Sequence, residues 1–479
     1  MGATSRKRRI FANRTLNFRG IKAVGYDMDY TIIHYLEREW EKTAYSYALD
    51  RLRGFGWPLD GLTFDPALMI RGLVIDTELG NIVKANRFGF INRAFHGTRA
   101  LPFDETKSCY ARTIVDLSDR RFQFMNTLFS LSEACLYAQL VELFDNQKLS
   151  GVSTYDELYR RVRTALDVVH MEGRLKAEIA LDPDRFVDLD PETALAIIDQ
   201  RHADKKLVLI TNSEWAYTRA LMTYAFDRYL PSGTTWRDLF DITIVEARKP
   251  DFFLSRNAVF EVVSEDGLLR SSATGIRPGG TYVGGSADLV EKALGLAGEE
   301  ILYVGDHIFS DVHVTKNILR WRTALILREL EDEIEAIEAF APQMTRLEAL
   351  MARKSALEHA QCQLRIRTQR RRFGYDPVGS TPPEEIQVDA GHLREQLDAL
   401  DEQIAPLAQS AAELGNRHWG LLLRAGNDKS QLARQMERYA DIYTSRVSNF
   451  AFETPFAYLR SVRGTLPHDD RNHSDDAQP

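Results

Sequence analysis

Asp27 and Asp29 are the residues of this sequence whose type and spacing most clearly suit catalysis. They stand two apart in Asp-Met-Asp-Tyr-Thr at residues 27–31, directly after the apolar run 21–26. One carboxylate can attack phosphorus and form an aspartyl phosphate, and the other can protonate the leaving oxygen and later deprotonate water. A Mg²⁺ ion would cancel the repulsion between carboxylate and phosphate. Because the pattern is short and arises often by chance, its meaning depends on what accompanies it.

Three later segments place complementary side chains after short apolar runs of the same kind. The runs span 207–210, 242–245 and 301–304. The polar residues that follow them are Thr211, Asn212 and Ser213, then Lys249, and then Asp306 and Asp311. Taken alone, each has an ordinary explanation, such as a helix cap or a solvated lysine. Four polar strand ends in one chain favour a phosphate site more strongly than any one motif does.

These groups have distinct chemical uses at such a site. The hydroxyls, amide and backbone N–H groups of 211–213 can hold phosphate oxygens at a helix N-terminus. Lys249 can balance the charge of the phosphate and of the nucleophile. Asp306 can ligate magnesium, and Asp311 can orient Lys249 or belong to the metal's surroundings. The expected enzyme is a magnesium-dependent phosphoric monoester hydrolase.

The elements that must position these residues form an α/β fold. Apolar runs that alternate with helical patterns predict a Rossmann-like open parallel sheet, in which ligands bind at the carboxyl ends of the strands. Nearly 180 residues separate the first two runs, whereas a single crossover needs only about 30. We therefore expect an inserted domain, mainly helical with some short strands, that covers the strand ends as a cap.

The composition changes after about residue 330. A charged, helix-favouring stretch runs to Arg372, a loop rich in Pro, Gly and Ser follows at 377–383, and a second helical stretch runs from His392 to about Leu414. This pattern predicts an antiparallel helical hairpin. The expected organisation is a core at 1–85 and 196–330, a cap at 86–195, a hairpin extension at 331–415, and a C-terminal helical segment at 416–479 that packs on the core.

Bulk properties exclude several classes of protein. The 479 residues are 44% apolar and 27% charged, with a net charge of −8, which is typical of a soluble enzyme and gives no global attraction to nucleic acid or an anionic membrane. No apolar run approaches the roughly 20 residues of a membrane span. The three cysteines form no metal or redox pattern. We expect a cytoplasmic protein. The arginine cluster at 365–372 is interpreted as a solvated helix face or as paired with acidic residues nearby, with nucleic-acid binding as the minority alternative.

The four polar segments, in this order, resemble the haloacid dehalogenase-like hydrolases, and most closely the cytosolic purine 5′-nucleotidase family. Residues 71–76, 126–129 and 284–286 also resemble that family, and the likeness covers about 15–330 and again about 417–468. It implies hydrolysis of nucleoside 5′-monophosphates, preferably IMP and GMP, with possible phosphate transfer to another nucleoside. It further implies Asp27 as nucleophile, Asp29 as general acid/base, and Mg²⁺ held by Asp27, Asp306 and the backbone carbonyl of Asp29. Family members tend to form dimers or tetramers.

The segment 163–170 resembles the family's purine-reading helix. Arg163 and Asp167 stand four apart and therefore share one helix face. An arginine can donate to O6 and N7 of a 6-oxopurine, and a carboxylate can accept from N1–H, which adenine lacks. The alternative is an ordinary intrahelical salt bridge, worth about 0.2–0.5 kcal/mol. Further family positions near the base are matched by Phe129, which could stack on it, and by Asn126, His170 and Lys176.

The sequence departs from the family in three places. Met171 replaces an aromatic residue beside the base, and Asp116 and Asn317 replace basic residues that bind an activating nucleotide, so we expect no activation of the ATP type. The hairpin at 335–415 has no family counterpart and could serve assembly. Two alternatives stay open: a phosphatase or phosphotransferase of other small phosphate esters, and a non-catalytic scaffold on the same fold.

Overall fold

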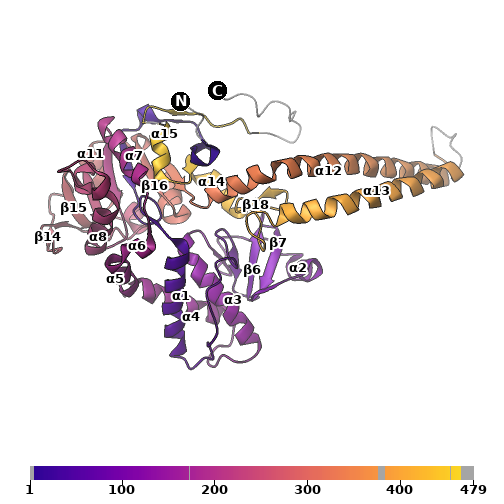
Figure 1. The fold of residues 1–479 in the computed structure, drawn as a ribbon, viewed down its shortest axis with the longest axis horizontal. Helices are drawn as coiled ribbons and strands as arrows, with labels where there is room; N and C mark the ends of the chain where they lie inside the picture. The colour runs from indigo at the N-terminus through magenta and orange to yellow at the C-terminus, as the bar shows by residue number, and fades with distance from the viewer. Residues whose placement is uncertain (1–4, 172, 376–382, 454, 465–479) are drawn as a thin grey trace.

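A ten-stranded, largely parallel sheet forms the centre of the molecule (Figure 1). The computed structural model describes residues 5–171, 173–375, 383–453 and 455–464. The strand order is β1-β20-β17-β16-β3-β11-β12-β15-β13-β14. The seven parallel strands are β3 (Ala23–Tyr26), β11 (Lys206–Ile210), β12 (Ile242–Val245), β15 (Gly280–Gly284), β16 (Ile301–Gly305), β17 (Arg322–Ile326) and β20 (Ile442–Thr444). The antiparallel edge strands are β1 (Phe11–Ala12), β13 (Val259–Val262) and β14 (Leu269–Ser271).

The four strands predicted from apolar runs are adjacent in the middle of this sheet, in the order β16-β3-β11-β12. They are almost wholly buried, as expected of parallel strands covered on both faces. Because the four run in the same direction, their carboxyl ends meet at one edge. The prediction of an α/β fold with an open parallel sheet is confirmed.

A second unit covers this edge. Its helices α1 (Glu37–Arg53), α3 (Leu131–Asp145) and α4 (Tyr155–Met171) pack on one another, and α5 (Arg174–Leu181) follows them (Figure 1). Its five-stranded antiparallel sheet has the order β8-β7-β6-β5-β9. These strands are β5 (Val74–Asp76), β6 (Asn81–Ala85), β7 (Ile91–His96), β8 (Arg99–Ala100) and β9 (Phe122–Phe124). The elements that cover the site therefore begin before residue 86, since α1 and β5 pack with them.

The core and the cap are joined by a short ribbon. The chain leaves the core through β4 (His34–Tyr35) and returns through β10 (Val187–Asp188), and the two strands pair antiparallel. We call this pair the linker ribbon. It places Tyr35, which pairs with Val187, at the boundary between the core and the cap.

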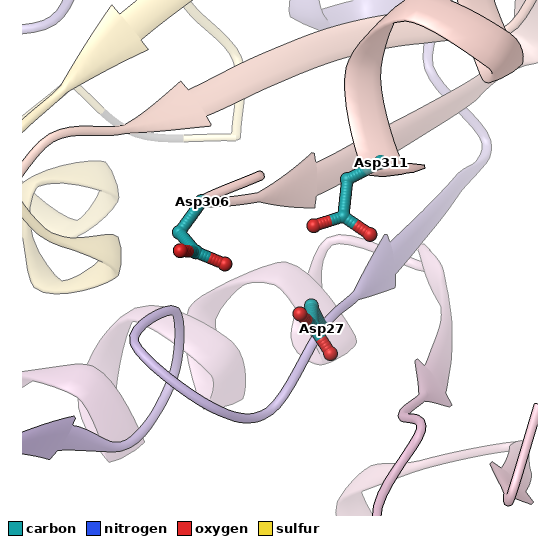
Figure 2. A group of neighbouring side chains, drawn as sticks. All are labelled: Asp27, Asp306 and Asp311. Carbon is teal, nitrogen blue, oxygen red and sulfur yellow. The ribbon is translucent and has the colours of Figure 1, made fainter. Parts of the chain in front are cut away.

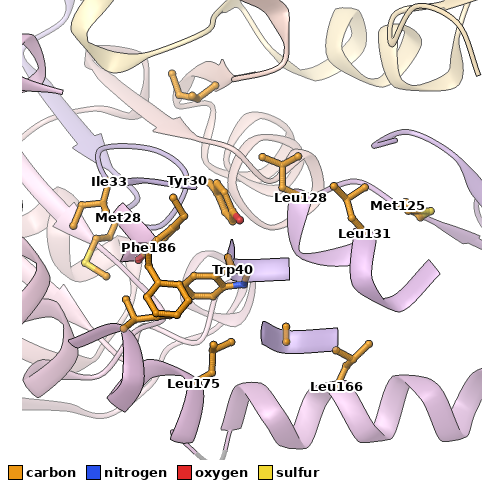
Figure 3. Close-up of a cluster of buried hydrophobic side chains, with 14 of the residues drawn as sticks. Met28, Tyr30, Ile33, Trp40, Met125, Leu128, Leu131, Leu166, Leu175 and Phe186 are labelled. Atoms are coloured by element: carbon orange, nitrogen blue, oxygen red, sulfur yellow. The ribbon is translucent and has the colours of Figure 1, made fainter. Parts of the chain in front are cut away.

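One apolar cluster continues across that boundary. Met28 and Tyr30 from the turn after β3 lie with Trp40 of α1 and Leu131 of α3 (Figure 3). Tyr30 and Trp40 are 2% and 3% exposed. Since Met28 and Tyr30 flank Asp29, packing against the cap fixes the turn that carries this carboxylate.

The helical hairpin consists of α12 (Leu330–Arg372) and α13 (Pro383–Ala412) and projects from the body of the molecule (Figure 1). At 1.5 Å per residue, the 43 residues of α12 span about 65 Å. The predicted hairpin is present, and its second helix begins nine residues earlier than expected. Leucines and other apolar residues at heptad-like spacing face each other along its length, as in an antiparallel coiled coil.

The segment after the hairpin is not only helical. It contains α14 (Gln431–Tyr439) and α15 (Phe450–Glu453), but between them β20 enters the central sheet beside β17 and β1. This strand was not predicted because only three residues, 442–444, form it and they carry no distinctive alternation. No helix within the described residues is long and apolar enough to cross a bilayer.

Candidate active site

Asp27 and Lys249 form the centre of the site at the carboxyl edge of the sheet. Asp27 ends β3, and its Oδ1 lies 2.7 Å from the Lys249 Nζ and accepts from the Met28 backbone N–H at 2.7 Å. The same Nζ lies 2.8 Å from Asp311 Oδ1 and donates to the Tyr303 hydroxyl at 3.1 Å. The lysine is thus held between two carboxylates.

Asp306 is placed by contacts from both the core and the cap. Its backbone carbonyl accepts from Arg71 Nη2, and its Oδ2 accepts from the Thr127 hydroxyl at 3.2 Å. Gly305 precedes it at the end of β16. A Cβ there would lie 2.6 Å from the Asp311 Cβ, so only glycine lets Asp311 approach the strand end. Asp311 itself lies on the π-helical turn η6 (Ile308–His313).

The three carboxylates of Asp27, Asp306 and Asp311 converge (Figure 2). One oxygen from each lies within 4.8 Å of the others, and all three residues are buried. Hard oxygen ligands of this kind suit Mg²⁺. Lys249 pairs with Asp27 and Asp311, and the buried Arg71 touches Asp306, so these two cations balance only two of the three carboxylates. The donor set therefore fits a divalent cation held by Asp27 and Asp306, with Asp311 beside them.

Burial and neighbouring charge set the protonation of these groups. Burial raises the pKa of Asp27 above its ordinary value, although Lys249 opposes the shift. Burial raises the pKa of Asp306 to about 7, which Arg71 opposes. Burial also works against the charge on Lys249, yet Asp27 and Asp311 hold its pKa well above the usual range. The lysine accordingly stays charged, and its charge favours the ionised form of the nucleophile.

Asp29 is oriented by two hydroxyl groups. Tyr35 of the linker ribbon donates to its Oδ1, and the Ser213 hydroxyl donates to its Oδ2 at 2.8 Å. The Tyr35 hydroxyl also lies 3.0 Å from that of Tyr217 on α8 (Trp215–Phe226). Burial, with Asp29 nearby, raises the pKa of Tyr35 far above its ordinary value, so this hydroxyl keeps its proton. Both oxygens of Asp29 are therefore held by neutral donors.

Thr211, Asn212 and Ser213 follow β11 beside Lys249, as predicted. The Asn212 side chain accepts from the Lys249 backbone N–H at 2.6 Å and donates to the Lys249 carbonyl at 3.2 Å. The Thr211 hydroxyl accepts from the Ser213 N–H at 3.0 Å. Asn212 thus joins the second and third strand ends, and the segment leads into the N-terminus of α8.

The predicted base-reading pair lies on α4 of the cap. Arg163 Nε is 3.3 Å from Asp167 Oδ1, and both side chains are about half exposed, at 53% and 52%. A second carboxylate, Glu133 on the first turn of α3, lies 3.4 Å from Arg163 Nη1. Glu133, with Asp167 in a smaller part, raises the pKa of Arg163. The guanidinium is thus shared between two carboxylates, of which the sequence indicated one.

The other residues predicted to contact the base lie in different surroundings. Phe129 packs against Tyr30 and Trp40, with ring centroids 4.7 and 5.3 Å apart. Lys176 lies at the phosphate side, where its Nζ donates to the Ser213 hydroxyl at 3.2 Å and to Glu214 at 2.9 Å. The backbone carbonyl of Asn126 accepts a hydrogen bond from Arg71 Nε at 2.9 Å. The side chains of His170, Met171 and Asn317 lie outside what the structure describes, and Asp116 is exposed on a cap loop.

The sequence as a whole matches the profile of a known protein family. The profile of the 5′ nucleotidase family matches residues 10–471. The chain belongs to the 5′ nucleotidase family. A 5′-nucleotidase domain-containing protein of Dictyostelium discoideum is 25% identical over 470 residues, which cover 96% of this chain and 74% of that protein. Family membership supports a phosphatase that acts on nucleoside monophosphates.

Two solved structures that this nucleotidase-family chain resembles share little sequence with it. An archaeal beta-phosphoglucomutase from Pyrococcus is 9% identical, with 64% of this chain and 86% of that chain covered and a TM-score of 0.31. A haloacid dehalogenase-type phosphatase from Thermococcus onnurineus is 14% identical, with 64% and 87% covered and a TM-score of 0.24.

Other residues of the site had no predicted role, and Tyr35, Arg71 and Glu133 are among them. Tyr35 orients Asp29, Arg71 holds the Asp306 carbonyl, and Glu133 pairs with Arg163. Arg71 belongs to the segment 71–76, which resembles the family in sequence. That likeness indicated the importance of the segment but not the contact that Arg71 makes. Tyr35 and Glu133 carry no signal in the sequence, because each acts on a residue in a different element.

Proposed function

We propose that this chain hydrolyses purine nucleoside 5′-monophosphates, with IMP and GMP preferred, in a reaction that requires Mg²⁺. The observation that carries the proposal is the buried group in which Lys249 lies 2.7 Å from Asp27 and 2.8 Å from Asp311, beside Asp306. A carboxylate held by a lysine at a strand end is a positioned nucleophile. Membership of the 5′ nucleotidase family narrows its target to nucleotides.

The side chains divide the reaction into two steps. Asp27 attacks phosphorus, the bond from phosphorus to the ester oxygen breaks, and Asp29 gives its proton to the leaving 5′ oxygen. Asp29 then takes a proton from water, which attacks the aspartyl phosphate and releases phosphate, so that both carboxylates return to their first states. Transfer to a nucleoside hydroxyl follows the same second step with another acceptor. Lys249 and the 211–213 segment bind the phosphate oxygens.

Mg²⁺ would be held by Asp27, Asp306 and the backbone carbonyl of Asp29, with Asp311 nearby. When bound, it neutralises phosphate charge and polarises the phosphoryl group. The excess of buried carboxylates over cations supports this assignment. A cluster that binds a divalent ion is also stabilised by it through mass action.

The base preference follows from Arg163 and its two carboxylates. A guanidinium that donates to O6 and N7 and a carboxylate that accepts from N1–H distinguish 6-oxopurines from adenine. Since each polar group of such a site is left unpaired by the wrong base, discrimination can be large. Arg163 on α4 contacts Glu133 in the first turn of α3. Phe129 lies two residues before α3 and packs against Tyr30, the neighbour of Asp29. This connection supports a base site continuous with the phosphate site.

The test is phosphate release from IMP, GMP, AMP, CMP and a sugar phosphate, with MgCl₂ and with EDTA. We expect IMP and GMP to be cleaved fastest, with no release in EDTA. Equal rates on all five compounds would remove the base assignment and leave a general phosphatase. No release from any of them in MgCl₂ would favour the non-catalytic scaffold.

A further inference from the structure

The two helices of the hairpin carry opposite charge. On α12, residues 346–372 contain eight basic and two acidic side chains, counting Lys, Arg, Asp and Glu. On α13, residues 388–412 contain five acidic and one basic. At 1.5 Å per residue, the basic side chains of α12 are spread over about 40 Å, and the acidic side chains of α13, at residues 389–402, over about 20 Å beside them.

Several of these charged side chains form no ion pair within the described part of the hairpin. Among the side chains that the structure describes on the two helices, the ion pair between them joins Lys354 to Asp401. Arg353 and Arg367 on α12 and Glu395 and Asp398 on α13 are exposed and belong to none of the ion pairs found. The heptad seam is filled by apolar residues such as Leu357. The segregated charge is thus available to something outside this chain.

Apolar side chains accompany the charge. Ile337, Met351 and Ile366 on α12 are 38%, 41% and 40% exposed, although the seam with α13 lies beside them. A two-stranded coiled coil covers only its narrow seam, so side chains at flanking positions stay open to a further helix. The exposed apolar side chains of α12 can contact a further helix, and the charged side chains can fix the register in which that helix packs.

We propose that this hairpin is an interaction surface for the hairpin of a second copy of the same chain. A two-fold axis places the basic helix of each copy beside the acidic helix of the other, so the same pair of complementary contacts forms twice in the dimer. The product is a four-helix bundle in which neighbouring helices alternate in charge. Nucleic acid fits less well, because the acidic side chains at 389–402 of α13 lie beside α12 and would repel phosphates there.

The charge pattern dictates the experiment. One triple variant makes the hairpin acidic through Arg353→Glu, Arg365→Glu and Arg367→Glu. A second triple variant makes it basic through Glu395→Lys, Asp398→Lys and Glu402→Lys. The full chain is used throughout, and the Lys354–Asp401 pair stays intact. Sedimentation and far-UV circular dichroism report mass and helix content. The matched control makes the same acid-to-lysine change at three exposed sites outside the hairpin: Asp104, Asp266 and Glu299.

We expect the parent and the control to be dimers and each triple variant to be a folded monomer. Mixing the two variants should restore a dimer that contains one copy of each, because each basic helix then meets an acidic one. Raising NaCl from about 0.01 to about 1 M shortens the screening length from about 30 to about 3 Å and should raise the parent's dissociation constant at least tenfold.

Three outcomes would overturn the proposal. They are a monomeric parent, folded variants that stay dimeric when unmixed, and folded variants that do not associate when mixed. A monomeric parent that binds a DNA duplex, with the binding lost in the acidic variant, would instead assign α12 to nucleic acid.

Discussion

The sheet edge and cap helix α4 both pair a cation with carboxylates, but under opposite conditions. Lys249 and its partners Asp27 and Asp311 are nearly or fully buried, with side chains at most 11% exposed, whereas Arg163 and Asp167 are about half exposed. Removing one member of a buried pair leaves an uncompensated charge, while an exposed pair is worth little to stability. The edge thus fixes its side chains as part of the fold, and the cap presents side chains that can be exchanged without unfolding it.

The largest effect is expected at the nucleophile. Asp27→Asn keeps the shape but removes the attacking carboxylate, so phosphate release from IMP should fall about 10⁴-fold or more. The measurement is kcat with saturating MgCl₂, and circular dichroism checks the fold. A variant that keeps a tenth of the parent's activity would contradict the role of Asp27 at this edge.

The next effect tests how far the edge depends on its lysine. Lys249→Met removes a donor to the phosphate and leaves Asp27 facing Asp311, so kcat/KM should fall about 10²- to 10³-fold. The free energy of unfolding should fall by about 3–5 kcal/mol, as for a broken buried pair. The double variant Asp27→Asn with Lys249→Met should regain part of that stability in urea melts. If Lys249→Met is as stable as the parent, the buried pairs of the sheet edge contribute no more to stability than the exposed pair on α4.

Tyr35→Phe sharpens the comparison at the boundary between the two regions. Without this donor Asp29 loses one of its two hydroxyl contacts, and release from IMP should slow about tenfold, a part of what a general acid supplies. p-Nitrophenyl phosphate has a leaving group that needs little protonation, so its first step should be much less affected. Equal slowing of both substrates would indicate a merely structural tyrosine.

Arg163→Ala breaks the exposed pair. It should lower kcat/KM for IMP and GMP about tenfold while p-nitrophenyl phosphate, which has no purine, is hydrolysed as before. Thermal stability should change by no more than about 0.5 kcal/mol. Glu133→Gln is the matched control, since it removes the second partner of Arg163 but leaves Asp167. Loss of activity on every substrate would place Arg163 in the phosphate machinery instead.

The smallest effect concerns a buried carboxylate of the cap that has no cation. Glu41 accepts from the Ser132 N–H at the start of α3, and burial raises its pKa to about 8 from the ordinary 4.5. The folded state holds the proton more tightly, so stability is full below about pH 4.5 and is lost as pH rises through about 8. Glu41→Gln should therefore match the parent at pH 5 and melt higher at pH 9. Parallel melting curves from pH 5 to 9 would contradict the shift.

The sequence predicted the sheet edge well because strand ends are local features. Each of the four central strands is an apolar run that ends at a polar residue, and parallel pairing alone brings these residues together. Contacts between separate elements could not be predicted this way. Tyr35 meets Asp29 only because the linker ribbon pairs Tyr35 with Val187, 152 residues later in the chain. Glu133 meets Arg163 only because α3 and α4 pack as antiparallel neighbours.

The position of β20 has a consequence for how the chain is made. Residues 442–444 complete the sheet between β17, more than a hundred residues earlier, and β1 at the N-terminal end, whose Phe11 pairs with Tyr443. During synthesis β17 leaves the ribosome long before its neighbour exists, while the whole hairpin is translated in between. An open parallel edge of this kind invites pairing with other chains. The nascent protein therefore passes through a prolonged aggregation-prone stage that ends only when residues 442–444 have emerged.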